Sequence, residues 1–405
     1  MTAESLEMSD EPDFLVIILT VTTMKGNVCG LDVHKDNVFV CILKENGEKI
    51  LQRVGILTPE LDALRDMLVS HGVGEVCMES TSIYWMPVWR VLESDFHLWL
   101  VNPLAIKQLP GRKSDVKDAE WIATCLKKDL VRGSYVPEEV IQQLRQYNRR
   151  VFDINKETVF LHNKLDAALQ RCNIRLSNYV SNVDTKAYRE VVEDLSKGVT
   201  DPGTLLGHIH KRTKNKWGED VLRSALTGVV SEVDTELIGM YREELELLRT
   251  QKAKCLSRMR EICQKHFPKQ MKDLQTMPGV REQSATQIIA EIGVDMRTFL
   301  TAAMLVGWAG FKPRNDESNK KLKSRSITHG NKYLKKLMVE CAWGATRTQG
   351  CFYSQFSYHQ TQVRKKNAMK VRVAVARKQL VGIWHILSEG CTYKEYSEKK
   401  EEGES

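Results

Sequence analysis

Residues 27–57 read NVCGLDVHKDNVFVCILKENGEKILQRVGIL, and this stretch decides the fold of the first domain. Its apolar runs predict two or three β-strands, and Glu45-Asn46-Gly47 has the composition of a hairpin turn. A helix opened by Thr58-Pro59 follows, then a strand at VGEVCMES, an aromatic-rich helix and a strand at FHLWLVNP. This order predicts an α/β domain with a mostly parallel core behind an antiparallel hairpin.

The chain changes to a helical pattern after Pro137. From Leu144 to Cys172, apolar residues recur every three or four positions, which is typical of a coiled-coil seam, and a weaker seam lies within 233–266. Two long helices with such seams predict an arm. The seams are equally compatible with pairing between two chains and with an antiparallel hairpin inside one chain.

The predicted organisation is α/β followed by all-α, in five segments. Residues 392–405, TYKEYSEKKEEGES, lack apolar periodicity, and we expect them to be frayed. The segments are an N-terminal extension (1–27), the α/β domain (28–135), a helical coiled-coil arm (136–272), a C-terminal helical domain (273–390) and a tail (391–405).

Charge is distributed unevenly along the chain. The net charge is +8, but between Lys312 and Lys378 there are 17 Lys or Arg and three acidic residues, so the rest of the chain is mildly acidic. A local basic segment of this kind indicates a polyanionic partner.

The ten cysteines form no C-x-x-C pair, which favours reduced thiols. No apolar run reaches the ~20 residues of a membrane span, and a cytoplasmic location is expected.

Four carboxylates have settings that suggest metal binding. Asp32 and Glu79 each lie in an apolar strand, where an unpaired charge costs several kcal/mol. Asp115 and Asp118 are three residues apart at a predicted helix start, so they share one face. Clustered carboxylates are the ligands that Mg²⁺ prefers, and paired metal ions stabilise the attacking and leaving oxygens of a phosphodiester.

The motifs GLDVHKD, EVCME and VNPLAIKQLPGRKSDVKDAEWIA together resemble those of the DEDD transposases of bacterial insertion sequences, which have a RuvC-like (ribonuclease H-like) N-terminal domain. The resemblance extends from about Val28 to Gly390. It implies that the family's acidic tetrad is Asp32, Glu79, Asp115 and Asp118, binding Mg²⁺.

A helix-hairpin-helix is predicted within residues 274–293. Pro278-Gly279-Val280 joins two short amphipathic helices, and Gly279 at such a turn would present backbone N–H groups to DNA phosphates. The motif also resembles the C-terminal domain of the same transposase family. A plain helical hairpin within a bundle is the alternative interpretation.

The basic block at 307–347 resembles the family domain that supplies a catalytic serine. The matching position is Ser318, and Ser324 and Ser326 are the other candidates. Where the family has small glycines after the serine, this chain has Asn319-Lys320. The expected nucleic-acid contacts in the block are Arg314, Lys320, Lys321, Lys323, Arg325, Lys332, Lys335 and Lys336.

The resemblance implies a DNA transposase or recombinase that forms a phosphoserine–DNA intermediate. It also implies a structured guide RNA encoded by the element, donor and target DNA as partners, and assembly as a dimer or tetramer. Two other classes remain compatible with the residues alone. One is a RuvC-like nuclease or junction resolvase in which water attacks the phosphate. The other is a nucleic-acid-binding protein without catalytic activity.

Overall fold

The computed structural model describes residues 25–80, 82–103, 115–313, 316–318, 321–324 and 326–403. The chain divides into two compact units, Met1–Val136 and Pro137–Ser405.

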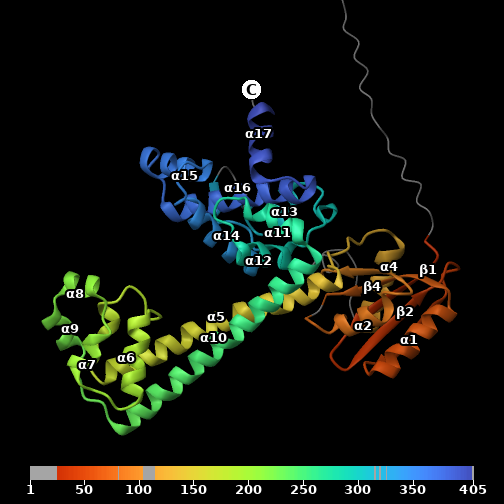
Figure 1. Cartoon of the computed structure of the whole chain (residues 1–405). Helices are drawn as coiled ribbons and strands as arrows, with labels where there is room; N and C mark the ends of the chain where they lie inside the picture. Colours follow the sequence, from red (N-terminus) through yellow and green to blue (C-terminus); the bar gives the residue numbers. More distant parts are fainter. Residues whose placement is uncertain are drawn as a thin grey trace, which may run out of the picture. The chain divides into compact units, whose positions relative to one another are not determined.

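The first unit is a five-stranded sheet with helices on both faces (Figure 1). The strand order is β3-β2-β1-β4-β5, in which β1 pairs antiparallel with β2 and parallel with β4. The elements are β1 (Asn27–Val33), β2 (Asn37–Leu43), β3 (Lys49–Gly55), α1 (Thr58–Ser70), β4 (Val73–Glu79), α2 (Trp85–Leu92), β5 (His97–Val101) and α4 (Asp115–Lys127).

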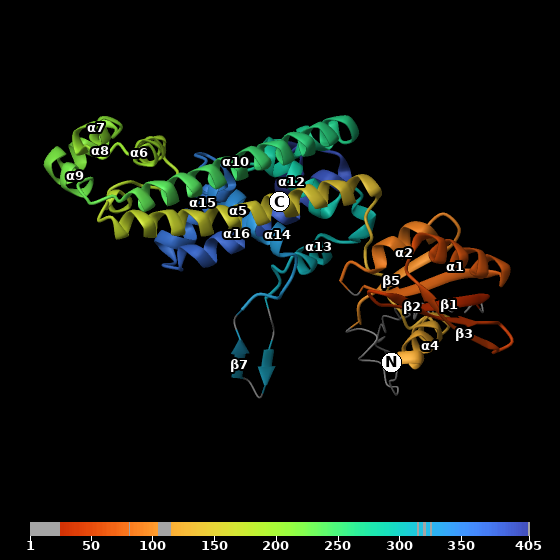
Figure 2. The same ribbon diagram turned by 90° about the horizontal axis from the view of Figure 1, so that it is seen from below.

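Alternation along the strands assigns each residue to one face of this sheet. Leu31 and Met78 belong to the core formed with α1 and α2, whereas Val28 and Cys77 pack with Ile122 of α4. Figure 2 shows α1 and α2 on one side of the sheet and α4 on the other. This mixed sheet with helices is the ribonuclease H-like α/β arrangement predicted from the sequence.

The second unit is almost entirely helical. Its helices are α5 (Glu139–Arg171), α6 (Lys186–Ser196), α7 (Pro202–Gly207), α8 (Lys211–Trp217), α9 (Glu219–Ala225), α10 (Glu232–His266), α11 (Pro268–Gln275), α12 (Glu282–Ile292), α13 (Ala302–Trp308), α14 (Lys332–Ala345), α15 (Phe352–Tyr358), α16 (Ala368–Glu389) and α17 (Tyr393–Gly403). Its strands are β6 (Asp316–Ser318) and β7 (Lys321–Ser324). The predicted helical region is therefore confirmed, and this short hairpin is an addition that the sequence did not indicate.

The two seam helices pair within this chain. Helices α5 and α10 run side by side as an antiparallel hairpin, and α6–α9 lie at its far end (Figure 1). Arg171 at the end of α5 bonds Asp234 at the start of α10, and Arg150 bonds Gln251. The intramolecular alternative is therefore the one that this chain adopts.

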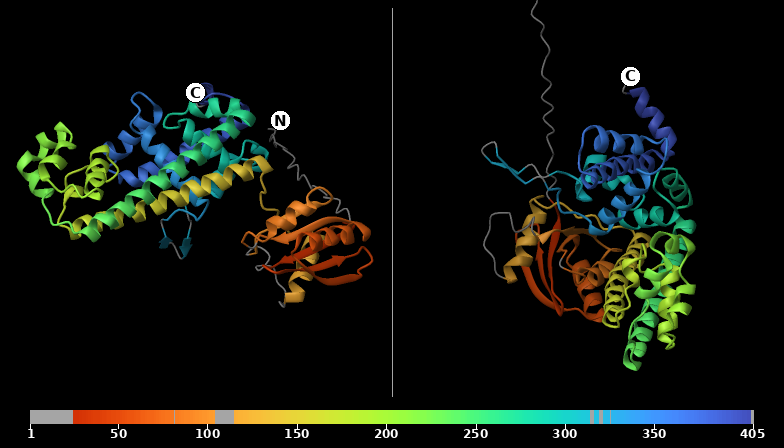
Figure 3. Two further views of the ribbon diagram at one scale, coloured as in Figure 1. Left: turned by 60° about the horizontal axis from the view of Figure 1, so that its bottom comes forward. Right: turned by 90° about the vertical axis from the view of Figure 1, so that its left-hand side faces the viewer.

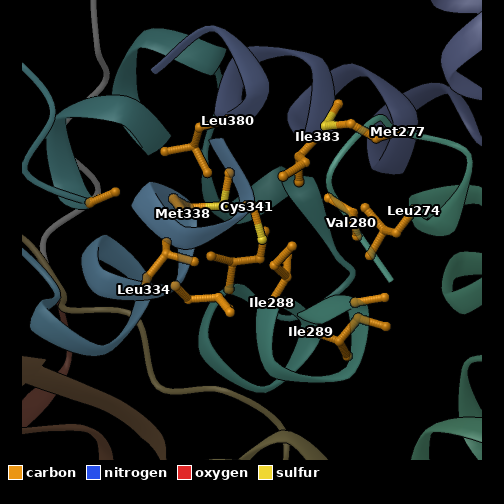
Figure 4. Packing of buried hydrophobic residues seen from close by; sticks show 14 of the residues in the cluster. Leu274, Met277, Val280, Ile288, Ile289, Leu334, Met338, Cys341, Leu380 and Ile383 are labelled. Carbon is orange, nitrogen blue, oxygen red and sulfur yellow. The ribbon is translucent and has the colours of Figure 1, made fainter. Parts of the chain in front are cut away.

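One large core holds the C-terminal helices together and includes the base of the arm. Leu274 and Met277 from the α11 end, Ile288 from α12, Met338 from α14 and Ile383 from α16 meet in this core (Figure 4). Ile141 and Leu144 of α5 belong to the same cluster. The base of the arm is thus an integral part of the C-terminal core.

The prediction of a frayed tail is wrong for residues 393–403, which form α17. Thr392 and Glu395 cap the helix reciprocally, since each backbone N–H donates to the other's side chain. Tyr396 stacks on His385 of α16, with ring centroids 5.0 Å apart. Capping and aromatic packing compensate for the missing apolar stripe.

Among the described residues, none of the helices combines the length and the apolar character that a bilayer crossing requires.

Candidate functional site

Asp32 and Glu79 lie at the carboxyl ends of adjacent parallel strands. Leu31 of β1 pairs with Met78 of β4, so the next residue of each strand is one of these two acids. Residues two positions apart on a strand share one face of the sheet. Gly30 and Cys77 lie on the face covered by α4, and Asp32 and Glu79 each follow one of them by two positions. Both acids therefore belong to the face covered by α4. Asp32 is only 8% exposed, and Glu79 is half-buried. The carboxyl ends of parallel strands are where α/β sheets commonly bind ligands.

A glycine allows α4 to approach these strands closely. A Cβ atom at Gly30 would lie 2.3 Å from the carbonyl oxygen of Ala119 and 2.4 Å from the amide nitrogen of Ala123. Asp118 immediately precedes Ala119 and is half-buried, and Asp115 begins the same helix one turn earlier. The backbone therefore brings the predicted helical acids to the face of the sheet that carries the two strand acids. The side chain of Asp115 lies outside the described residues.

His34 is a functional candidate that the sequence analysis missed. Its Nε2 atom is 3.0 Å from Oδ2 of Asp32, and its ring meets Phe39 edge to face at 5.6 Å between centroids. Phe39 is the cross-strand partner of Asp32, so the ring contact fixes the imidazole beside the carboxylate. The i, i+2 spacing in GLDVH was the available signal. A hydrogen bond of this kind orients a carboxylate for its function.

The donor set suits a divalent metal ion in its chemistry. Asp32, Glu79 and Asp118 offer hard carboxylate oxygens from three elements of one face, as Mg²⁺ and related ions require. In the part of the chain that the structure describes, no three His, Cys, Asp or Glu side chains are gathered closely enough to hold an ion. Buried thiols nearby are poor competitors as ligands, because burial raises the pKa of Cys77 to about 12.

Ser318 ends the first strand of a β-hairpin. It pairs with Lys321 in the β6–β7 ladder, and Pro313 and Ile327 form a bridge at the base. Figures 2 and 3 show the hairpin projecting away from the helices of the second unit. Ser324 ends β7, and Ser326 lies just beyond it with an exposed side chain. The three serine candidates thus belong to one projecting hairpin. The side chains of Ser318 and Ser324 lie outside the described residues.

The predicted cations of the basic block fall into two groups. Arg314, Lys320 and Arg325 lie outside the described residues, as do the side chains of Lys321 and Lys323.

The second group is on α14, where the three lysines have different environments. Lys332 and Lys336 are exposed. Lys335 is half-buried and donates to the carbonyl oxygen of Thr328 at 3.1 Å, and burial lowers the pKa of its ammonium group. Lys335 therefore stabilises the chain entering α14, whereas its two neighbours are available to a ligand.

The turn at Gly279 is packed against α14. Gly279 has φ +84°, and a Cβ atom there would lie 2.2 Å from the carbonyl oxygen of Cys341. Gln379 of α16 donates to the carbonyl oxygen of Pro278 at 2.8 Å. Close packing thus requires glycine at this turn, and the phosphate contact through Gly279 stays a prediction.

Two family models match the chain. Residues 29–174 match the DEDD transposase domain of IS110, and residues 271–357 match the transposase family IS116/IS110/IS902. The sheet with its strand-end acids and the helical C-terminal region therefore define a DEDD transposase, an enzyme that cleaves and transfers DNA strands. More specifically, the chain belongs to the IS110 family of transposases. A search of curated proteins found no match.

Membership of this family decides between the classes that the residues left open. The protein is a DNA-binding transposase that acts in DNA recombination, so the alternative without catalytic activity is wrong. A DEDD domain also implies the use of a divalent metal ion.

Proposed function

We propose that this transposase cleaves DNA with Ser318 as the nucleophile and with Mg²⁺ held by Asp32, Glu79, Asp115 and Asp118. The observation that carries the proposal is that Asp32 and Glu79 end adjacent parallel strands on the face covered by α4. Bound Mg²⁺ would supply stabilisation of the charge that develops on the phosphate and on the leaving oxygen.

In the proposed serine step, one O–P bond forms and one O–P bond breaks. The Oγ atom of Ser318 attacks the scissile phosphorus, an O–P bond forms, and the bond from phosphorus to the leaving deoxyribose oxygen breaks. The serine proton ends on the released deoxyribose hydroxyl group. The resulting phosphoserine ester conserves the energy of the phosphodiester, so attack by a second DNA end can rejoin strands without another energy source. The hairpin projects from the helices of the second unit (Figure 2), which suits a nucleophile that must reach a duplex.

We also propose that a guide RNA encoded by the element and a second copy of the chain complete the active assembly. The resemblance to the family supports the RNA. The arm supports oligomerisation, because several large apolar side chains remain exposed on it although its seam is already paired within the chain. These side chains are Val159, Phe160, Val233, Met240 and Leu247.

The experiment compares four proteins on DNA carrying the element's ends, with the RNA transcribed from the element. Asp32→Asn and Ser318→Ala should each lower strand cleavage by at least ~100-fold, since each removes a reacting or charge-stabilising group. Glu93→Gln, an exposed acid on the same domain, is the matched control and should cleave like the parent.

Four results would count against parts of the proposal. Full cleavage by Ser318→Ala would mean that water or another serine attacks. Unchanged cleavage by Asp32→Asn would exclude the acidic site. Strand exchange that survives ribonuclease treatment would exclude RNA guidance, and a monomer in multi-angle light scattering of the DNA complex would exclude the oligomer.

A further inference from the structure

An open groove lies where the base of the arm meets the C-terminal core. Its volume is about 390 Å³, within the ~300–1,000 Å³ range of small-ligand sites. Side chains of α5, α10, α12 and α14 line it, and most of them are polar. Among the polar lining residues are Asn155, Lys252, Gln283, Gln287 and Lys336.

Two aromatic rings at this groove hold four cations. Phe152 of α5 meets Tyr333 of α14 edge to face, with centroids 4.8 Å apart, and both rings line the groove. Two cationic groups lie 4.6–5.5 Å from the centre of the Phe152 ring, and two lie 5.0–5.1 Å from that of Tyr333. The cations are Lys156 and Lys336 on Phe152, and Arg149 and Lys332 on Tyr333.

This concentration of positive charge is only partly balanced by acids. Lys156 is ion-paired with Asp153 at 3.2 Å. Lys252 and Lys336 are the cations among the described lining residues, and Glu340 is the acid. Like charges this close repel one another, and contact with the ring faces offsets only part of that cost. A polyanion at the mouth of the groove would neutralise the remainder.

The wall of the groove is held by a buried hydrogen-bond network. Glu291 of α12 is fully buried, and its two carboxylate oxygens accept from Asn148 at 2.8 Å and from Asn331 at 2.6 Å. Gln287 donates to Asn148 at 2.9 Å. The network joins α5, α12 and the cap of α14, so the amide-bearing wall is rigid before any ligand arrives.

We propose that this groove binds one unpaired nucleotide of a nucleic-acid strand, with its phosphates on the ring-held cations and its base against the amides inside. The inference rests on the proposed function, because it assumes a nucleic-acid partner. Phosphates need cations, and a base edge needs amide donors and acceptors such as those of Asn155 and Gln283. The groove offers both at adjoining positions.

An unpaired strand fits this arrangement better than a duplex does. In a duplex the base edges are recessed in grooves and the phosphates lie outside, so a duplex on the cations would leave the amides without a partner. A single strand can turn one base inward while its phosphates remain at the mouth. A single DNA strand and an RNA loop present the same chemistry.

The binding test uses the full chain and three probes of one sequence, about 20 units long. The probes are single-stranded DNA, single-stranded RNA and duplex DNA, each measured by fluorescence anisotropy. Lys252→Ala and Asn155→Leu should weaken binding of the preferred single strand by about tenfold and leave duplex binding within twofold. Lys254→Ala, two residues from Lys252 on α10 and outside the groove, is the matched control and should match the parent.

The outcomes separate this inference from the proposed function. Tighter binding of RNA or of DNA by the parent identifies the source of the nucleotide. Groove variants that bind single strands like Lys254→Ala would overturn the groove and leave the proposed function standing. Equal losses on single strands and duplex would show phosphate contact alone and would also overturn it. A parent that binds none of the probes would overturn both.

Photocrosslinking of the unsubstituted protein gives a second readout that no folding defect can affect. A single strand carrying 5-iodouracil should crosslink to peptides that contain Phe152 or Tyr333, identified by mass spectrometry. Crosslinks confined to other peptides would overturn the groove.

Discussion

Replacing Gly30 with alanine should separate helix α4 from the sheet that carries Asp32 and Glu79. The added Cβ atom would lie 2.3 Å from the carbonyl oxygen of Ala119, and ordinary van der Waals contact begins at 3.4 Å. Helix α4 must therefore move away from the sheet by about 1 Å before the Cβ atom and the carbonyl oxygen reach ordinary contact distance. Both partners of the clash are backbone atoms, so no side chain can rotate out of the way.

The expected cost has two parts. Overpacking of this kind destabilises a core by about 1–3 kcal/mol, which denaturant unfolding would measure. A displacement of ~1 Å in an active-site group costs about 100-fold in rate, and strand cleavage would report it. The retreat of α4 carries Asp118 and the start of the helix with it, so cleavage should fall further than stability alone explains.

Gly74→Ala is the matched control for this prediction. Gly74 lies in β4 of the same sheet, and an added Cβ there meets nothing within 4 Å. The control should retain parental stability and cleavage. If Gly30→Ala cleaves DNA as well as Gly74→Ala does, the close approach of α4 has no part in positioning the acids, and the reasoning is refuted.

Three further predictions concern stability. Glu291→Ala should lower the free energy of unfolding in urea by about 2–3 kcal/mol, because it leaves the buried amide of Asn148 and the half-buried amide of Asn331 without this acceptor. An unchanged free energy of unfolding would contradict the network. Lys335→Met should lower the free energy of unfolding by about 1 kcal/mol and leave the affinity for DNA unchanged. Lys332→Met should weaken DNA binding and leave the free energy of unfolding unchanged. If Lys335→Met weakens DNA binding and Lys332→Met lowers stability, both assignments are refuted. Burial raises the pKa of Cys77 and Cys263 to about 12. The folded protein therefore keeps protons that the unfolded chain releases near pH 9, so the free energy of unfolding should fall between pH 9 and pH 12. This fall should be less steep in Cys77→Ala. An equally steep fall in the variant and the parent would contradict the effect of burial.

The sequence was sufficient to predict the sheet and to single out the two strand-end acids that we propose as metal ligands. An acid in a strand of buried apolar residues is conspicuous, because the surrounding pattern has no solvent-facing position for it. Asp32 and Glu79 were singled out in this way, and the strand register shows that they lie at adjacent strand ends. The spacing of His34 from Asp32 was visible, but the hydrogen bond between them also depends on the conformation of the β1–β2 turn, which the pattern does not specify.

Tertiary contacts explain where prediction from the sequence stopped. A heptad seam is satisfied equally by a partner chain or by a returning helix, so the hairpin of α5 and α10 could not be chosen beforehand. Helix α17 lacks an apolar stripe and depends on rings of other helices, including Tyr353 and His385. Its one local signal was the Thr392-x-x-Glu395 capping box. The β6–β7 hairpin has too many charged residues for an alternating pattern to reveal it.

The groove at the base of the arm could not be predicted from the sequence either. Phe152 and Tyr333 are far apart in the chain, and their contact depends on α5 packing against the C-terminal helices. The basic residues of α14 were visible as a charge cluster, but the arm cations Arg149 and Lys156 lie in a segment of mixed charge. Only the fold shows that all of them surround one aromatic pair.

The most direct test of the account is to identify the residue that becomes linked to DNA. The protein would be incubated with Mg²⁺ and cognate DNA containing a nick that prevents rejoining, digested with protease and nuclease, and analysed by mass spectrometry. The account predicts one nucleotide-bearing peptide, modified at Ser318 and absent from the Ser318→Ala and Asp32→Asn variants. Cleaved DNA with no attached peptide, or a nucleotide on Ser324 or Ser326, would contradict it.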